Sequence, residues 1–312
     1  MKIYVGLTDW SWFDYLRSSD CNEVNFWKPS GAPFKALQEG DLFLFRTKAA
    51  HGGKIVGGGF FTKYLTMTVD WAWRAFGTEN GVHNLAELSD RISSYRTRKN
   101  LLIENPKIGC IILNDVFYFD ERDWFDAPGN WRSIVTGKGY SLDDEDGKWL
   151  MKQVSMRRMS MDLSTLTAEP QQPIIDQGAD RYAVSQTKHR LGQGAFRALV
   201  ADAYHDRCAI TGEKTMPVLQ AAHIKPYSQD GPHAVSNGLF LRSDIHTLFD
   251  TGYITVTPKL TIEVSKRLHN DFGNGHIYYA YQGEELQIIP DDAGNRPSKD
   301  FLEWHNDCVF LK

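Results

Sequence analysis

Four residues in the second half of the chain have the types and the order that hydrolysis of a phosphodiester bond requires: His223, Asn237, His246 and Asp250. Cleavage of this bond needs a group that takes a proton from the attacking water. It also needs positive charge to stabilise the phosphate and the leaving 3′ oxygen. A neutral histidine can be the base, and one divalent metal ion can supply the charge. This set of residues therefore predicts phosphodiester hydrolysis on one metal ion.

Each residue suits one of these tasks. His223 follows an apolar run and is the natural general base. A histidine base must be held in one tautomer by a hydrogen-bond partner, and Asn237 could do this or fix the loop between them. His246 and Asp250 lie four residues apart, so on a helix they share a face and could bind the metal together. Asp244 could reach the metal from the helix start.

Short apolar runs predict the elements that carry these side chains. PVLQAAHI (217–224) and NGLFLR (237–242) have the lengths of strands. SDIHTLFDTG (243–252) is typical of a short helix, with Ser243 as N-cap and Gly252 just past its end. The expected order is strand, loop, strand, helix. An amphipathic helix precedes them, with its apolar positions at Phe196, Leu199, Val200 and Tyr204. After Gly252, the runs ITVTPKLTIEVS (254–265) and YYAYQGEELQIIP (278–290) are also strand-like.

The motifs R-C-A-I-T-G, A-A-H-I-x-P, N-G-L-F-L-R and D-I-H-x-L-F-D-x-G resemble those of the HNH nucleases with a ββα-metal finger, in the branch common in bacterial restriction endonucleases. The likeness extends from Gly192 to about residue 310. The resemblance implies that His223 is the general base and that His246 binds the metal. It also implies that Asn237 either orients the base or ties the finger together.

One position departs from that family's pattern. Many HNH proteins place Asp or His directly before the base as a metal ligand, whereas this chain has Ala222. Asp244, Asp250 or water must then complete the ligand set. We expect Mg²⁺, with Mn²⁺ or another transition metal as alternatives. His233, in the loop before Asn237, is expected at the surface or facing DNA rather than on the metal.

The amino-acid composition limits the number of domains, the source of DNA contacts and the kind of metal site that we expect. A chain of 312 residues with 42% hydrophobic and 24% charged residues predicts two globular domains. The net charge of −4 means that contacts with DNA must come from local basic residues, for which Arg190, Arg197 and Arg242 are the candidates. The four cysteines form no C-x-x-C pair, which argues against a zinc ribbon. We expect a soluble protein of the bacterial or archaeal cytoplasm, with no membrane segment.

The first half predicts a mixed α+β domain. Strand-like runs at 2–8, 41–46, 54–65 and 108–119 indicate a curved sheet or small barrel, and 85–95 has a helical apolar face. Eight of the nine tryptophans fall before residue 150. Trp71 and Trp73 alternate as in a strand, which would place them on one face of the sheet.

The segments Thr8-Asp9-Trp10, Asn25 to Ser30, L-x-x-G-D-L-F-L-F-R (37–46) and I-V-G-G-G (55–59) resemble the PUA-like superfamily, especially its EVE, YTH and SRA-type readers of modified bases. In such readers a base is flipped from the duplex into an aromatic pocket. The resemblance makes Asp9, Trp10, Trp27 and Ser30 the candidates for this pocket. Core packing is the alternative role for the tryptophans.

These expectations combine into one hypothesis. Residues 1–164 would be the reader, 165–180 a linker and 181–312 the HNH domain. The protein would be a type IV-like, modification-dependent restriction endonuclease that acts as a homodimer on double-stranded DNA carrying 5-methylcytosine or 5-hydroxymethylcytosine. Two alternatives stay open. The first domain could sense RNA, a nucleotide or a protein, or the finger could be a non-catalytic binder of nucleic acid.

Overall fold

The computed structural model describes residues 1–19, 21–97, 104–129, 131, 134, 136–166 and 191–312. The chain divides into two compact units, 1–189 and 190–312, which are described separately. Helix α4 (Glu145–Leu166) extends through the first two residues of the predicted linker. The rest of that linker lies outside the described residues. No described helix is both long and apolar enough to cross a membrane.

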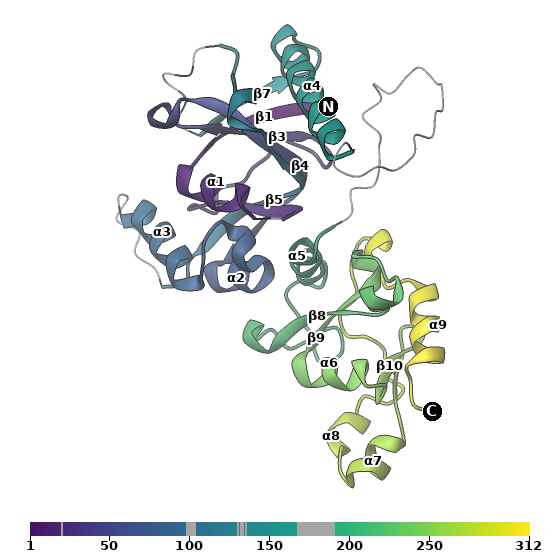
Figure 1. Cartoon of the computed structure of the whole chain (residues 1–312). Helices are drawn as coiled ribbons and strands as arrows, with labels where there is room; N and C mark the ends of the chain where they lie inside the picture. Colours follow the sequence, from purple (N-terminus) through teal and green to yellow (C-terminus); the bar gives the residue numbers. More distant parts are fainter. Residues whose placement is uncertain (20, 98–103, 130, 132–133, 135, 167–190) are drawn as a thin grey trace, which may run out of the picture. The chain divides into compact units, whose positions relative to one another are not determined.

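The first unit is built on a mixed sheet with helices beside it, which confirms the α+β class (Figure 1). The strands follow the order β2-β5-β4-β3-β1-β7, and β6 pairs with β4. β1 and β3 are parallel, and the other pairs are antiparallel. The strands are β1 (Lys2–Thr8), β2 (Glu23–Lys28), β3 (Leu42–Thr47), β4 (Lys54–Thr68), β5 (Lys107–Tyr118), β6 (Phe125–Asp126) and β7 (Gly137–Ser141).

Glycines in β4 allow its neighbours to approach closely. A Cβ on Gly57 would lie 2.3 Å from the carbonyl oxygen of Phe117, and one on Gly58 would lie 2.6 Å from that of Phe43. The pairing of β4 shifts register against β3 and against β5. These irregularities bend the strand, as glycines within a strand commonly do.

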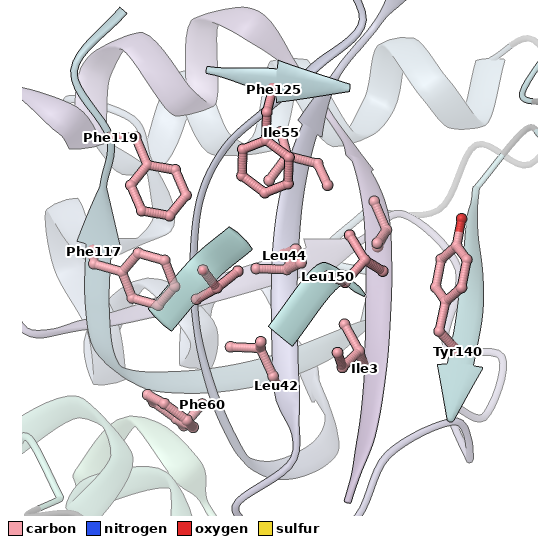
Figure 2. Packing of buried hydrophobic residues seen from close by; sticks show 12 residues of the cluster. Ile3, Leu42, Leu44, Ile55, Phe60, Phe117, Phe119, Phe125, Tyr140 and Leu150 are labelled. Carbon is pink, nitrogen blue, oxygen red and sulfur yellow. The ribbon is translucent and has the colours of Figure 1, made fainter. Parts of the chain in front are cut away.

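Alternation along β3 divides the core of the first unit between the two faces of the sheet. Leu42 and Leu44 pack with Ile3 of β1 and with Leu150 of α4, as Figure 2 shows. Phe43 and Phe45 belong to the opposite cluster, which includes the buried side of α1 (Trp10–Arg17). Helix α4 thus packs on one face of the sheet, and α1 packs on the other.

The expectation that Trp71 and Trp73 lie in a strand is wrong. Both belong to α2 (Val69–Phe76), whose first turn is capped by the Thr68 hydroxyl, and α3 (Leu85–Thr97) follows. Val69, Ala72 and Phe76 are buried at helical spacing. An alternation of three residues is too short to distinguish the two periods. The 3₁₀ turns of this unit are Ala49–His51, Gly77–Asn80 and Glu121–Asp123.

The second unit contains the predicted order of strand, loop, strand, helix. Strands β8 and β9 form an antiparallel pair in which His223 lies opposite Gly238, and α6 follows directly. Its regular elements are α5 (Gln193–Ala203), β8 (Leu219–His223), β9 (Gly238–Arg242), α6 (Ser243–Asp250), β10 (Ile254–Val256), β11 (Ile262–Val264), α7 (Arg267–Phe272), α8 (His276–Tyr279) and α9 (Lys299–Cys308). The 3₁₀ turns are Met216–Val218, Tyr227–Gln229, Val235–Asn237 and Ala293–Asn295.

Two local expectations in this unit are wrong. Ser243 is the first residue of α6 and not its N-cap, because Arg242 occupies the extended cap position without a side-chain cap bond. The run 278–290 is not a strand, since it contains the end of α8 and only one isolated bridge, from Glu285 to Thr261. Aromatic and apolar composition alone favoured a strand there.

Candidate active site and base pocket

His223, at the end of β8, is held from two sides. The ring of Phe196, from α5, stacks on the His223 ring with a centroid separation of 3.9 Å and an interplanar angle of 11°. Nε2 of His223 lies 3.0 Å from Nδ1 of His233. Among the described residues, Nδ1 of His223 has no hydrogen-bond partner. This nitrogen is therefore available to accept a proton.

Asn237 is fully buried and ties the loop between the two strands. Its Oδ1 accepts a hydrogen bond from the backbone N of Lys225 at 2.9 Å. Its Nδ2 donates to the carbonyl oxygens of Lys225 and Pro232, each at 2.9 Å. The backbone oxygen of Asn237 also accepts from the N–H of Ile224. These contacts favour the role of tying the finger together over direct contact with the base.

His246, on α6, lies between two partners. Its Nδ1 is 2.7 Å from Oε1 of Gln220 on β8, and its Nε2 is 3.2 Å from Oδ2 of Asp250. Because an amide oxygen only accepts, Nδ1 carries the proton, and Nε2 then faces the Asp250 carboxylate. The lone pair of Nε2 would then face a lone pair of the carboxylate oxygen, unless a proton or a metal ion lies between the two atoms. The pair therefore fits a cation site.

Gln220 supplies the support that such a ligand needs. Histidines that bind metals usually donate the other ring N–H to a carbonyl or carboxylate, which fixes the tautomer.

The described residues contain no group of three or more His, Cys, Asp or Glu side chains that could hold a metal ion. Ala222 is fully buried and offers no ligand. A metal here would have His246 and Asp250 as its protein ligands, and its remaining positions would be left to water and phosphate.

Asp244 is engaged elsewhere. Both of its carboxylate oxygens accept hydrogen bonds from Arg242, at 2.6 and 2.8 Å, and Tyr278 donates to Oδ2 at 3.1 Å. The hydrogen bonds from Arg242 lower the pKa of Asp244. The structure thus places Asp244 in an ion pair, and the predicted DNA contact Arg242 is its partner. Arg197 lies on α5, whereas Arg190 falls outside the described residues.

Burial lowers the pKa of each histidine at this site. Desolvation, followed by the charges of His233, His246 and Arg197, lowers the pKa of His223 to about 4. Desolvation also lowers the pKa of His233. Burial raises the pKa of Asp250 and lowers that of His246, although each partner opposes the shift of the other. At neutral pH, His223 is therefore in the form that accepts a proton.

Comparison with known proteins agrees with this geometry. Residues 208–257 match the family model described as HNH endonuclease. The second unit contains an HNH endonuclease domain. The match spans β8, β9 and α6, and it supports a nuclease with DNA as substrate. No curated protein matches the chain.

The unit that precedes the HNH domain contains a cavity of about 480 Å³. Aromatic rings form much of its wall, with Trp27 and Phe26 from β2, Trp12 from α1 and Tyr95 from α3. The cavity has a size within the roughly 300–1,000 Å³ range of small-molecule sites. An aromatic wall of this kind can stack on a planar ligand.

Three of the four predicted pocket residues line this cavity, namely Asp9, Trp27 and Ser30. Trp10 is not among the described lining residues, because its ring stacks on His51 at 4.8 Å and packs into the core beside Phe13. Trp10 is the first residue of α1, directly after the Asp9 cap.

Charge gathers at the same cavity. Lys28, Lys48 and Arg96 line it, and Asp9 is the one carboxylate among the described lining residues. Asp9 accepts hydrogen bonds from Ser11, Lys48 and Tyr95. Although burial raises its pKa, the hydrogen bonds from Ser11 and Lys48 and the charge of Lys48 lower it to about 2. The cavity thus combines a fixed carboxylate with an excess of positive charge.

Sequence reasoning missed two residues beside the predicted catalytic groups. Gln220 lies three positions before His223 and contacts His246, which is 26 residues away. His233, expected at the surface or facing DNA, is half-buried and also contacts the His223 ring. A signal existed for His233, since it is the histidine of the loop that joins the two strands. No such signal existed for Gln220, because a glutamine on a strand usually faces solvent.

Proposed function

We propose that the protein is a modification-dependent, type IV-like restriction endonuclease. Its first unit holds a flipped modified base, most favourably 5-methylcytosine or 5-hydroxymethylcytosine, and its HNH domain hydrolyses a phosphodiester bond nearby. The observation that carries this proposal is the aromatic cavity, which brings together Asp9, Trp27 and Ser30 in the same chain as the HNH domain. The cavity also supports the resemblance of this unit to PUA-like readers.

The chemistry of the cavity suits a nucleotide. Stacking on aromatic side chains contributes roughly 1–3 kcal/mol per base. Lys28, Lys48 and Arg96 favour the phosphates that flank a flipped base. The ionised Asp9 can accept a hydrogen bond from the exocyclic amine that cytosine carries. A free nucleotide has the same features, so DNA and nucleotides must be compared directly.

In the HNH domain, His223 accepts a proton from the attacking water. The water oxygen forms a bond to phosphorus while the bond from phosphorus to the leaving 3′ oxygen breaks. That oxygen departs with the electron pair and takes a proton from solvent. A bound phosphate anion favours the imidazolium form, so DNA binding raises the pKa of His223 from its low value in the free protein.

His246 and Asp250 are the residues that would hold the divalent ion, for which Mg²⁺ is the first candidate. When bound, such an ion stabilises charge on the phosphate and on the leaving oxygen. Gln220 keeps Nε2 of His246 unprotonated for this purpose. Asp244 is the weaker candidate, because Arg242 already neutralises its charge.

Cutting both strands with one HNH domain per chain requires two chains or two successive events. We therefore propose a homodimer on double-stranded DNA. Sedimentation of the full chain with a modified duplex should give a mass of two chains per duplex. A complex with one chain per duplex that still cuts both strands would refute the dimer.

The reader is tested with four duplexes of one sequence, carrying cytosine, 5-methylcytosine, 5-hydroxymethylcytosine or 6-methyladenine. With Mg²⁺ or Mn²⁺ present, the full chain should cut at least one modified-cytosine duplex and leave the cytosine duplex intact. Trp27→Ala should weaken binding of the modified duplex about 5- to 150-fold. Trp149→Ala, an exposed tryptophan outside the cavity, is the matched control. Equal cutting of all four duplexes would refute the reader but not the nuclease.

The nuclease is tested with His223→Ala. Removing the base should slow cleavage about 10²- to 10⁴-fold, while binding of the modified duplex is retained. Undiminished cutting would remove His223 from the mechanism. Full binding with no cleavage by the wild-type protein under any divalent ion would indicate a finger that does not catalyse.

A further inference from the structure

We propose that His233 is a positioning residue that holds His223 in the tautomer required of a base. This inference rests on the proposed function, since it concerns the same hydrolysis. The observation is the contact of 3.0 Å between Nε2 of His223 and Nδ1 of His233, which joins the two imidazole rings.

The surroundings of His233 fix its orientation. The Tyr227 ring stacks on the His233 ring with a centroid separation of 4.8 Å and an interplanar angle of 9°. The residue before His233 is Pro232, whose carbonyl oxygen accepts a hydrogen bond from the buried Asn237. Phe196 packs against both imidazoles, at 3.9 Å from His223 and 5.8 Å from His233. Two aromatic rings and the loop that Asn237 binds therefore hold the two imidazoles in this contact.

One proton occupies this contact, and its position decides whether His223 can act. If Nε2 of His223 carries the proton, it donates to Nδ1 of His233, and Nδ1 of His223 keeps its lone pair for water. If Nδ1 of His233 carries the proton, it donates to Nε2 of His223. The proton of His223 then lies on Nδ1, and neither of its nitrogens can accept another. Only the first arrangement provides a base.

The first arrangement also stabilises the imidazolium that His223 forms. After Nδ1 of His223 takes the proton from water, both of its nitrogens carry protons. The Nε2–H still donates to Nδ1 of His233, and a hydrogen bond from a charged donor is stronger than one from a neutral donor. His233 thus contributes more after proton transfer than before it, which favours the transition state.

The test compares three substitutions that differ in where they place an acceptor. His233→Ala removes the acceptor. His233→Asn places an amide oxygen at the position of Nδ1, and His233→Gln places its amide one bond further out. On a 5-methylcytosine or 5-hydroxymethylcytosine duplex with Mn²⁺, we expect kcat to fall about 10- to 100-fold for His233→Ala with little change in KM. His233→Asn should restore most of this loss, and His233→Gln should not.

A second readout needs no cleavage. Long-range ¹H–¹⁵N spectra of the full chain with labelled histidine should show His223 protonated at Nε2, its signal being assigned by its loss in His223→Ala. In His233→Ala this tautomer should become mixed. A kcat unchanged in His233→Ala, equal losses for Asn and Gln, or a His223 tautomer that does not respond would each overturn the proposal. An unresponsive tautomer would do so even if the wild-type protein cut no DNA, which separates this failure from that of the proposed function.

Discussion

Replacing Asn237 with alanine tests whether this residue ties the finger or takes part in the chemistry. The side chain makes three hydrogen bonds to the backbone of Lys225 and Pro232, and it is fully buried. Each such bond contributes about 1 kcal/mol net, so their loss should cost about 3 kcal/mol. The N–H and C=O of Lys225 would lose these partners, whereas Pro232 keeps a bond from Ala234.

Hydrogen exchange of the full chain measures this loss of stability within the second unit itself. Tryptophan fluorescence reports mainly the first unit, because only Trp304 lies after residue 150. Peptides that cover β8 and β9 should exchange about 100-fold faster in Asn237→Ala if these amides open with the whole unit. Peptides from β4 and β5 of the first unit should not change and form the internal control.

Asn237→Asp is the matched variant. It keeps an acceptor for the N–H of Lys225 but turns an oxygen towards the carbonyls of Lys225 and Pro232, so it should destabilise the loop at least as much as alanine does. The reasoning fails if Asn237→Ala costs less than about 1 kcal/mol and cleavage is nevertheless abolished. Asn237 would then act on the base or the substrate directly.

Three further predictions concern other contacts. Gln220→Leu removes the acceptor for Nδ1–H of His246, so calorimetry should show Mn²⁺ affinity about 10- to 100-fold lower, and His246→Ala should abolish the site. Burial lowers the pKa of His305 to about 4. The unfolded chain therefore binds more protons between about pH 6.5 and 4, and exchange protection of β10 should fall as pH drops through this window but not in His305→Asn. Leu44→Ala in the core of the first unit should cost about 2–5 kcal/mol in urea unfolding followed by tryptophan fluorescence, and a smaller loss would contradict its close packing.

Residue spacing alone predicted much of the secondary structure of the HNH domain. Two apolar runs of strand length followed by a helical period predicted β8, β9 and α6. The placement of His246 and Asp250 on one face follows from the helix, since residues four apart are neighbours there. Short or ambiguous runs failed, as with Trp71 and Trp73 and with residues 278–290.

The sequence by itself determined which residues could carry the chemistry, since types and local spacing are properties of the chain. Tertiary structure decided what each of them contacts. Gln220 of β8 reaches His246 of α6, and Tyr278 of α8 reaches Asp244, because these elements pack together. His233 meets His223 because the loop bound by Asn237 folds back onto β8. Contacts between residues far apart in sequence depend on packing, which no local period encodes.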